Sequence, residues 1–169
     1  LSEQCEWNAR NPTRNVIEAH DLPDLIHITV LKEDAISGYS PGHLGHVLYP
    51  YFEKDIADGT ITEEEVIELL EVHRFKFSTI ELFASTGISG GISGNTFNNL
   101  SVGGLDKDGA PCGNRLEWLI LHAGMTNQSP QPTLSVLYDE RLPKDFLIKC
   151  VECTTTGVGY PAWMNNRVA

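Results

Sequence analysis

The chain has 169 residues, which is enough for one domain with a hydrophobic core. Its 23 acidic and 12 basic side chains give a formal net charge of −11, and they are spread over the whole chain. Such a surface repels phosphate backbones, so we expect no binding to nucleic acid. No apolar run approaches the roughly 20 residues of a membrane span and no signal peptide opens the chain, which predicts a cytoplasmic protein without membrane contact.

The first half of the chain contains one apolar run and two helical patterns. Residues 25–31 are almost all apolar and predict a strand or a buried element. Over residues 43–57 the apolar positions recur at helical spacing, and Gly59 follows as a C′ stop. Thr62 and Glu65 form a capping box, which predicts that a second helix begins there.

The second half alternates between strand and helix. We expect strands near residues 98–102 and 133–138, with a helix at 114–125 between them. A further helix at 143–156 and a strand at 158–163 continue the series. Short connections between alternating elements favour an α/β fold, and no linker divides the chain into two domains.

The four cysteines do not indicate a zinc ribbon, because they do not form two spaced pairs. Cys150 and Cys153 form a lone C-x-x-C in the second half of a predicted helix. A redox pair favours the helix N-terminus, where the dipole stabilises the thiolate. We therefore expect a buried structural pair, with a redox or metal-binding function as the alternative.

A G-x-S-x-G sequence at residues 87–91 matches the nucleophile elbow of α/β-hydrolases, with Ser89 as the nucleophile. That motif needs a helix directly after the serine. Residues 92–97 contain glycine and turn formers and do not predict one. We interpret the segment as a loop and keep the hydrolase as an alternative.

His43 and His46 are three residues apart at a predicted helix start, a spacing that can chelate a metal ion. No third ligand is adjacent in the sequence, so we expect no metal site and interpret both as surface or core histidines. Four other histidines could approach in space: His20, His27, His73 and His122.

Several blocks of the sequence, in their order and spacing, resemble the glycyl radical enzymes of the pyruvate formate-lyase-like group. The blocks are residues 40–56 with the acidic helix start at 62–66, then 98–104, 131–138 and 157–162. Together they cover residues from about 36 to 166. His43, Gly45 and His46 depart from the Ser-x-Gly-Arg-x-Asp-Gln pattern that is usual in the first block, so this block does not identify the subgroup.

The resemblance implies part of a ten-stranded α/β barrel surrounded by helices, in which a cysteine loop and a glycine loop meet. In the family, a radical-SAM activating enzyme installs a radical on the glycine. The radical passes to the cysteine, which then removes a hydrogen atom from a small-molecule substrate. Full-length members are expected to be homodimers, with the activating enzyme as a further partner.

Both radical loops are expected outside this chain, and none of its cysteines has the family's Gly-Cys-x-Glu context. We therefore expect no catalytic residue and no bound cofactor here. The chain begins at Leu1 rather than Met, which fits an internal fragment, residues 1–169, of one pyruvate formate-lyase-like catalytic domain. Alone, this fragment is expected to be inactive and only partly folded, because half a barrel leaves open sheet edges.

Residues 91–97 and 135–138 look most like the arylacetate decarboxylase branch, which includes hydroxyphenylacetate and indoleacetate decarboxylases. An aromatic acid needs an apolar wall, for which Phe97 and Ile92 are the candidates. Asn95 and Ser40 are the candidate polar contacts. The alternatives are another glycyl radical lyase or dehydratase that cleaves a C–O or C–N bond, a formate acetyltransferase-like enzyme, or an acidic α/β binding module.

Overall fold

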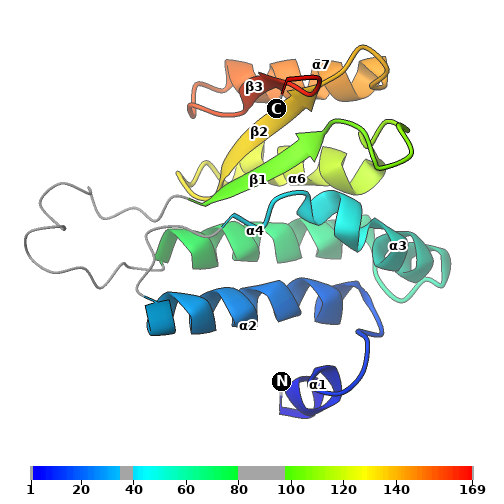
Figure 1. The fold of residues 1–169 in the computed structure, drawn as a ribbon, viewed down its shortest axis with the longest axis vertical. Coiled ribbons are helices and arrows are strands. Elements are labelled where there is room, and N and C mark those ends of the chain that lie inside the picture. Colours follow the sequence, from blue (N-terminus) through cyan, green and yellow to red (C-terminus); the bar gives the residue numbers. More distant parts are fainter. Residues whose placement is uncertain (1, 35–39, 80–97, 169) are drawn as a thin grey trace, which may run out of the picture.

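The computed structural model describes residues 2–34, 40–79 and 98–168 (Figure 1). In chain order the elements are α1 (Ser2–Asn8), α2 (Val16–Asp34), α3 (Leu44–Ala57), α4 (Glu63–Thr79), β1 (Asn99–Gly103), α6 (Arg115–Thr126), β2 (Thr133–Tyr138), α7 (Lys144–Thr155) and β3 (Ala162–Asn165). None of the helices in these ranges is long and apolar enough to cross a membrane.

The three strands form a parallel sheet in the order β1-β2-β3, and α6 and α7 are the crossovers (Figure 1). In this register Val102 lies beside Val136, and Val136 lies beside Trp163. Gly42 makes a single parallel bridge with Leu100 on the other side of β1. The predicted α/β class is therefore confirmed.

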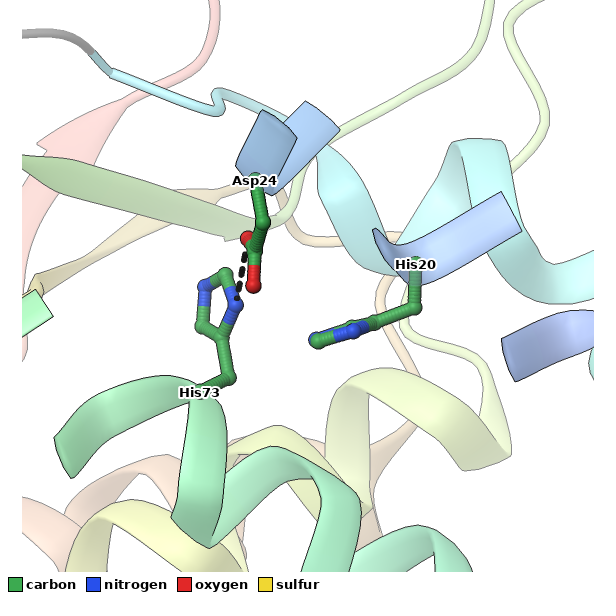
Figure 2. A group of neighbouring side chains, drawn as sticks. All are labelled: His20, Asp24 and His73. Carbon is green, nitrogen blue, oxygen red and sulfur yellow. Dashed lines mark ion pairs between the residues drawn. The ribbon is translucent and has the colours of Figure 1, made fainter. Parts of the chain in front are cut away.

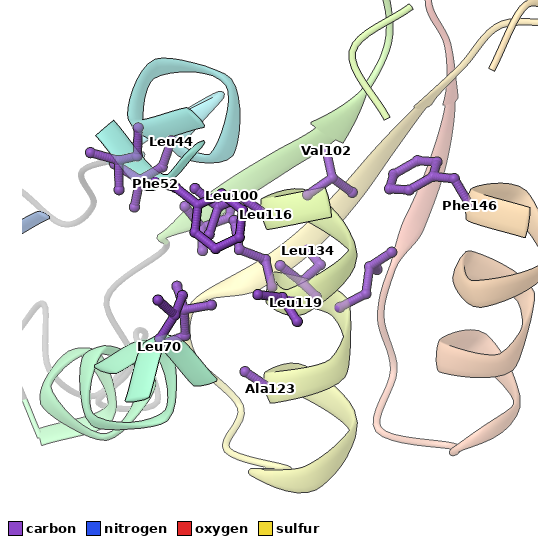
Figure 3. Close-up of a cluster of buried hydrophobic side chains, with 14 of the residues drawn as sticks. Leu44, Phe52, Leu70, Leu100, Val102, Leu116, Leu119, Ala123, Leu134 and Phe146 are labelled. Atoms are coloured by element: carbon purple, nitrogen blue, oxygen red, sulfur yellow. The ribbon is translucent and has the colours of Figure 1, made fainter. Parts of the chain in front are cut away.

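Alternation along the strands places one face of the sheet in the core. Leu100 and Val102 of β1 are buried, as are Leu134 and Val136 of β2. They pack with the apolar side of α6, whose members Leu116, Leu119, Ile120 and Ala123 are all buried as predicted (Figure 3). Each large aliphatic side chain buried in this way contributes roughly 1.5–3 kcal/mol to folding.

The helix signals in the first half are confirmed in detail. Gly59 follows α3 with φ +67°, a conformation that glycine adopts without strain. At the start of α4, the Thr62 backbone N–H donates to Glu65 Oε2 at 2.8 Å. The Glu65 N–H donates back to Thr62 Oγ1 at 3.2 Å, which completes the capping box.

The prediction for residues 25–31 is wrong, because this run lies inside α2. Nor is it buried as a whole, since Leu25, Ile26 and Ile28 are 36%, 45% and 40% exposed. The side of α2 that faces α4 carries polar residues, which conceals the helical period from a search for apolar residues. The last strand also differs, because β3 begins at Ala162 rather than near residue 158.

Arg74 of α4 is buried and joins segments that are far apart in the sequence. Its Nη2 donates to the Tyr160 hydroxyl at 2.6 Å and to the Ser129 carbonyl at 2.9 Å. Its Nε donates to the Asn127 carbonyl at 3.2 Å. The guanidinium therefore connects α4 to the loop after α6 and to the segment before β3.

The cysteine pair on α7 is buried, as predicted. Cys150 and Cys153 are free thiols with no exposed surface. Burial raises the pKa of the Cys150 thiol to about 12, and the neighbouring Cys153 adds to the effect. A thiol with such a pKa is inert at neutral pH, which fits a structural role.

Candidate functional site

The face of the sheet opposite α6 carries a row of polar side chains. Alternation places Asn99 and Ser101 of β1 on this face, together with Thr133 and Ser135 of β2. The hydroxyls of Thr133 and Ser135 donate to Asn99 Oδ1 at 3.1 and 3.0 Å. We call these four residues the polar sheet face. Their hydrogen bonds fix the orientation of the asparagine side chain.

The buried residues Asn98 and Gln131 connect the beginnings of β1 and β2. The Asn98 backbone N–H donates to Gln131 Oε1 at 3.1 Å. The Thr133 N–H donates to the Asn98 carbonyl at 3.0 Å. These bonds fix the point at which the chain enters β1.

Of the four predicted substrate contacts, only Ser40 lies within the described residues. It is exposed, two positions before Gly42, whose carbonyl accepts the Ser101 N–H at 2.8 Å. That bond brings the segment of Ser40 to the edge of β1. The other three predicted contacts, Phe97, Ile92 and Asn95, lie outside the described residues, as does Ser89.

Glu117 is a buried carboxyl group that the sequence analysis did not single out. It has no exposed surface and stands in the first turn of α6, where its N–H donates to the N-cap Asn114 Oδ1 at 2.9 Å. Its Oε2 accepts the Gly103 N–H at 2.8 Å. Burial raises the pKa of Glu117 to about 8, although the Gly103 hydrogen bond opposes this effect. At neutral pH the group is mostly protonated, and it joins the end of β1 to α6.

Within the described residues, His43 and His46 do not belong to a group of three potential metal ligands. His43 is half-buried, and His46 is exposed with its Nδ1 3.5 Å from Cys112 Sγ. Within the described ranges, the one group of three potential metal ligands is His20, Asp24 and His73. The interhelical position of this group was not predictable from sequence spacing.

A family model described as pyruvate formate lyase-like matches residues 1–169. The chain is 57% identical over 160 residues to the 4-hydroxyphenylacetate decarboxylase glycyl radical subunit of Clostridium scatologenes, covering 94% of this chain and 18% of the relative. It is 43% identical over 166 residues to the indoleacetate decarboxylase of Tractidigestivibacter scatoligenes, covering 98% of this chain and 19% of the relative. The chain thus spans less than a fifth of the length of these curated relatives.

A solved structure supports the fold. The hydroxyproline dehydratase of Clostridioides difficile, with trans-4-hydroxy-L-proline bound, superposes with a TM-score of 0.88 at 27% identity. The match covers 97% of this chain and 21% of the dehydratase. The arrangement of helices and strands is therefore that of the corresponding part of the dehydratase.

Proposed function

Because the chain belongs to the pyruvate formate lyase-like family, we propose that it is an internal segment of a glycyl radical enzyme that decarboxylates an arylacetate. The proposal rests on how the sequence identity decreases from one group of relatives to the next. Identity is 57% to the hydroxyphenylacetate decarboxylase subunit and 43% to the indoleacetate decarboxylase, but 27% to a dehydratase that shares the fold. The substrate proposed first is therefore 4-hydroxyphenylacetate, with indoleacetate second.

The architecture supports a place in the wall of a ten-stranded α/β barrel. Parallel strands joined by helices on one face are the repeating unit of such barrels. In that arrangement α6 and α7 lie outside, and the polar sheet face points to the interior. Both radical loops would come from other parts of the full-length protein.

In the proposed reaction the arylacetate loses carbon dioxide, and its methylene carbon gains a hydrogen to become a methyl group. The glycyl radical, installed by a radical-SAM activating enzyme, supplies the hydrogen-atom chemistry. This chain would bind and orient the substrate and exclude water. Phe97 and Ile92 would form the apolar wall against the ring, while Asn95 and Ser40 would make polar contacts. The full-length protein would be a cytoplasmic homodimer that binds the activating enzyme.

A segment exchange tests the substrate class. The matching segment of the Clostridium scatologenes subunit is replaced by this chain, and the chimera is activated without oxygen. We expect it to convert 4-hydroxyphenylacetate to 4-methylphenol and carbon dioxide, measured by gas chromatography. Electron paramagnetic resonance of the glycyl radical shows separately whether activation has succeeded. A chimera that carries the radical but turns over neither arylacetate contradicts the proposal.

The same chimera tests the site residues. Phe97→Ala should raise KM for the arylacetate, because the substrate ring loses its apolar wall. Phe75→Ala is the matched control, since Phe75 is a 64% exposed residue of α4. Equal KM values for the two variants would remove Phe97 from the proposed site.

A further inference from the structure

A polar cluster occupies the junction between α2 and α4, where apolar contacts are usual. His20 and Asp24 are four residues apart and so lie on the same side of α2. His73 comes from α4, and all three side chains point toward one another (Figure 2). Only 1%, 6% and 1% of their surfaces is exposed. The cluster is thus enclosed by the segment itself.

The three residues lie close enough together to hold one ion. One donor atom from each lies within 4.8 Å of the others, and His73 Nδ1 is 3.0 Å from Asp24 Oδ1. In a tetrahedral zinc site, ligand atoms about 2.0–2.1 Å from the metal are about 3.3 Å apart. The widest separation therefore has to shrink by at most about 1.5 Å, a change that side-chain rotations can make.

Protein groups leave much of the cluster without hydrogen bonds. Apart from the ion pairs that Asp24 makes with His73 and Lys76, the ring nitrogens of His20 and His73 and both Asp24 oxygens have no hydrogen-bond partner in the described part of the chain. His20 meets His73 through an edge-on ring contact with centroids 4.7 Å apart. Its Nδ1 is 3.6 Å from Asp21 Oδ1, which is longer than a hydrogen bond. Buried polar atoms without partners are costly and call for a ligand, water or ion.

One protein cation lies at the edge of the cluster. Lys76 Nζ is 3.5 Å from Asp24 Oδ2 and 3.9 Å from Asp21 Oδ1, and its side chain is 44% exposed. The ammonium balances part of the charge of Asp24, but neither ion pair involves a histidine nitrogen. Lys76 therefore competes with a metal ion for the carboxylate without replacing it at the imidazoles.

We propose that His20, Asp24 and His73 bind a divalent transition-metal ion of the zinc type, which connects α2 to α4. Two imidazoles and one carboxylate suit zinc and its neighbours, whereas calcium and magnesium prefer ligand sets made of oxygen. A water molecule would complete the tetrahedron. The ion would have a structural role that is separate from the radical reaction.

Zinc retention by the full-length protein, before activation, tests this site. The protein is stripped with a chelator, incubated with Zn²⁺ and desalted, and its zinc is measured by mass spectrometry. We expect one more bound zinc per chain in the wild type than in His20→Gln. His46→Gln makes the same change at an exposed histidine outside the cluster and should keep the wild-type value. Equal zinc in the wild type and His20→Gln overturns the proposal.

Two further measurements keep the test decisive if His20→Gln misfolds. Lys76→Gln removes the competing ammonium from Asp24, so it should raise zinc affinity several-fold in a chelator competition. A purely structural Asp–His pair predicts no such gain, and unchanged affinity counts against the site. Co²⁺ bound to the wild type should give the visible absorption of a tetrahedral nitrogen–oxygen site, and its absence overturns the proposal.

Discussion

Replacing Glu117 by Gln should remove a pH dependence from the stability of α6. The pKa of this carboxyl group rises from its ordinary value of 4.5 to about 8, because burial disfavours the charged form. Between pH 4.5 and about pH 8, Glu117 keeps its proton in the folded segment and releases it when the segment opens. The resulting stability is therefore complete below pH 4.5 and is lost as the pH rises through about 8.

The size of the effect follows from proton linkage. One pKa unit corresponds to about 1.4 kcal/mol, so the local stability should fall by roughly 2–3 kcal/mol between pH 5 and pH 7. That difference is roughly a 100-fold change in the opening equilibrium. Glutamine cannot ionise, and its oxygen can still accept the Gly103 N–H.

Hydrogen exchange of the full-length protein, followed by mass spectrometry of peptides from α6, measures this change. At each pH, the protection factor of the wild type is divided by that of Glu117→Gln. The pH dependence of the intrinsic exchange rate cancels in this ratio. We expect the ratio to fall about 100-fold from pH 5 to pH 7. Glu64→Gln, at an exposed position of α4, should show no trend in the α6 peptides. A constant ratio for Glu117→Gln would refute the argument from burial.

Two further predictions concern local structure. Thr62→Ala removes the Oγ1 that accepts the Glu65 N–H, so the first turn of α4 should lose about 1 kcal/mol of stability, seen as faster exchange of its amides. Cys150 and Cys153 should resist iodoacetamide in the folded protein and react once urea is added, because both are fully buried and their pKa values are raised; labelling without urea contradicts this.

The sequence predicts correctly those features that depend on residues a few positions apart. The cap at Thr62, the stop at Gly59 and the apolar side of α6 depend on spacings of a few positions, and all three are present. The prediction for residues 25–31 is wrong because the side of α2 that faces α4 carries polar groups, among them His20 and Asp24. A search for an apolar helical stripe cannot detect such a helix.

The candidate sites were harder to predict because they combine distant residues. His73 is 49 positions from Asp24, and nothing in the spacing of either residue predicts their contact. Glu117 was concealed for another reason, since an acidic residue in the first turn is the ordinary complement of the helix dipole. Only the tertiary structure shows that it is buried. The roles of Phe97, Ile92, Asn95 and Ser40 as substrate contacts stay predictions.

The buried position of Arg74 also affects the order in which the segment can fold during synthesis. Its partner Tyr160 lies 86 residues further along the chain, and the ribosome needs roughly 4–17 s to make that length. The carbonyls of Asn127 and Ser129 are made earlier, so α4 gains the full set of these guanidinium hydrogen bonds only when Tyr160 has emerged. The unit of β1, α6 and β2 is built from elements that follow one another in the sequence and can form earlier. A newly made chain can therefore pair its first two strands before the Tyr160 hydrogen bond fixes α4.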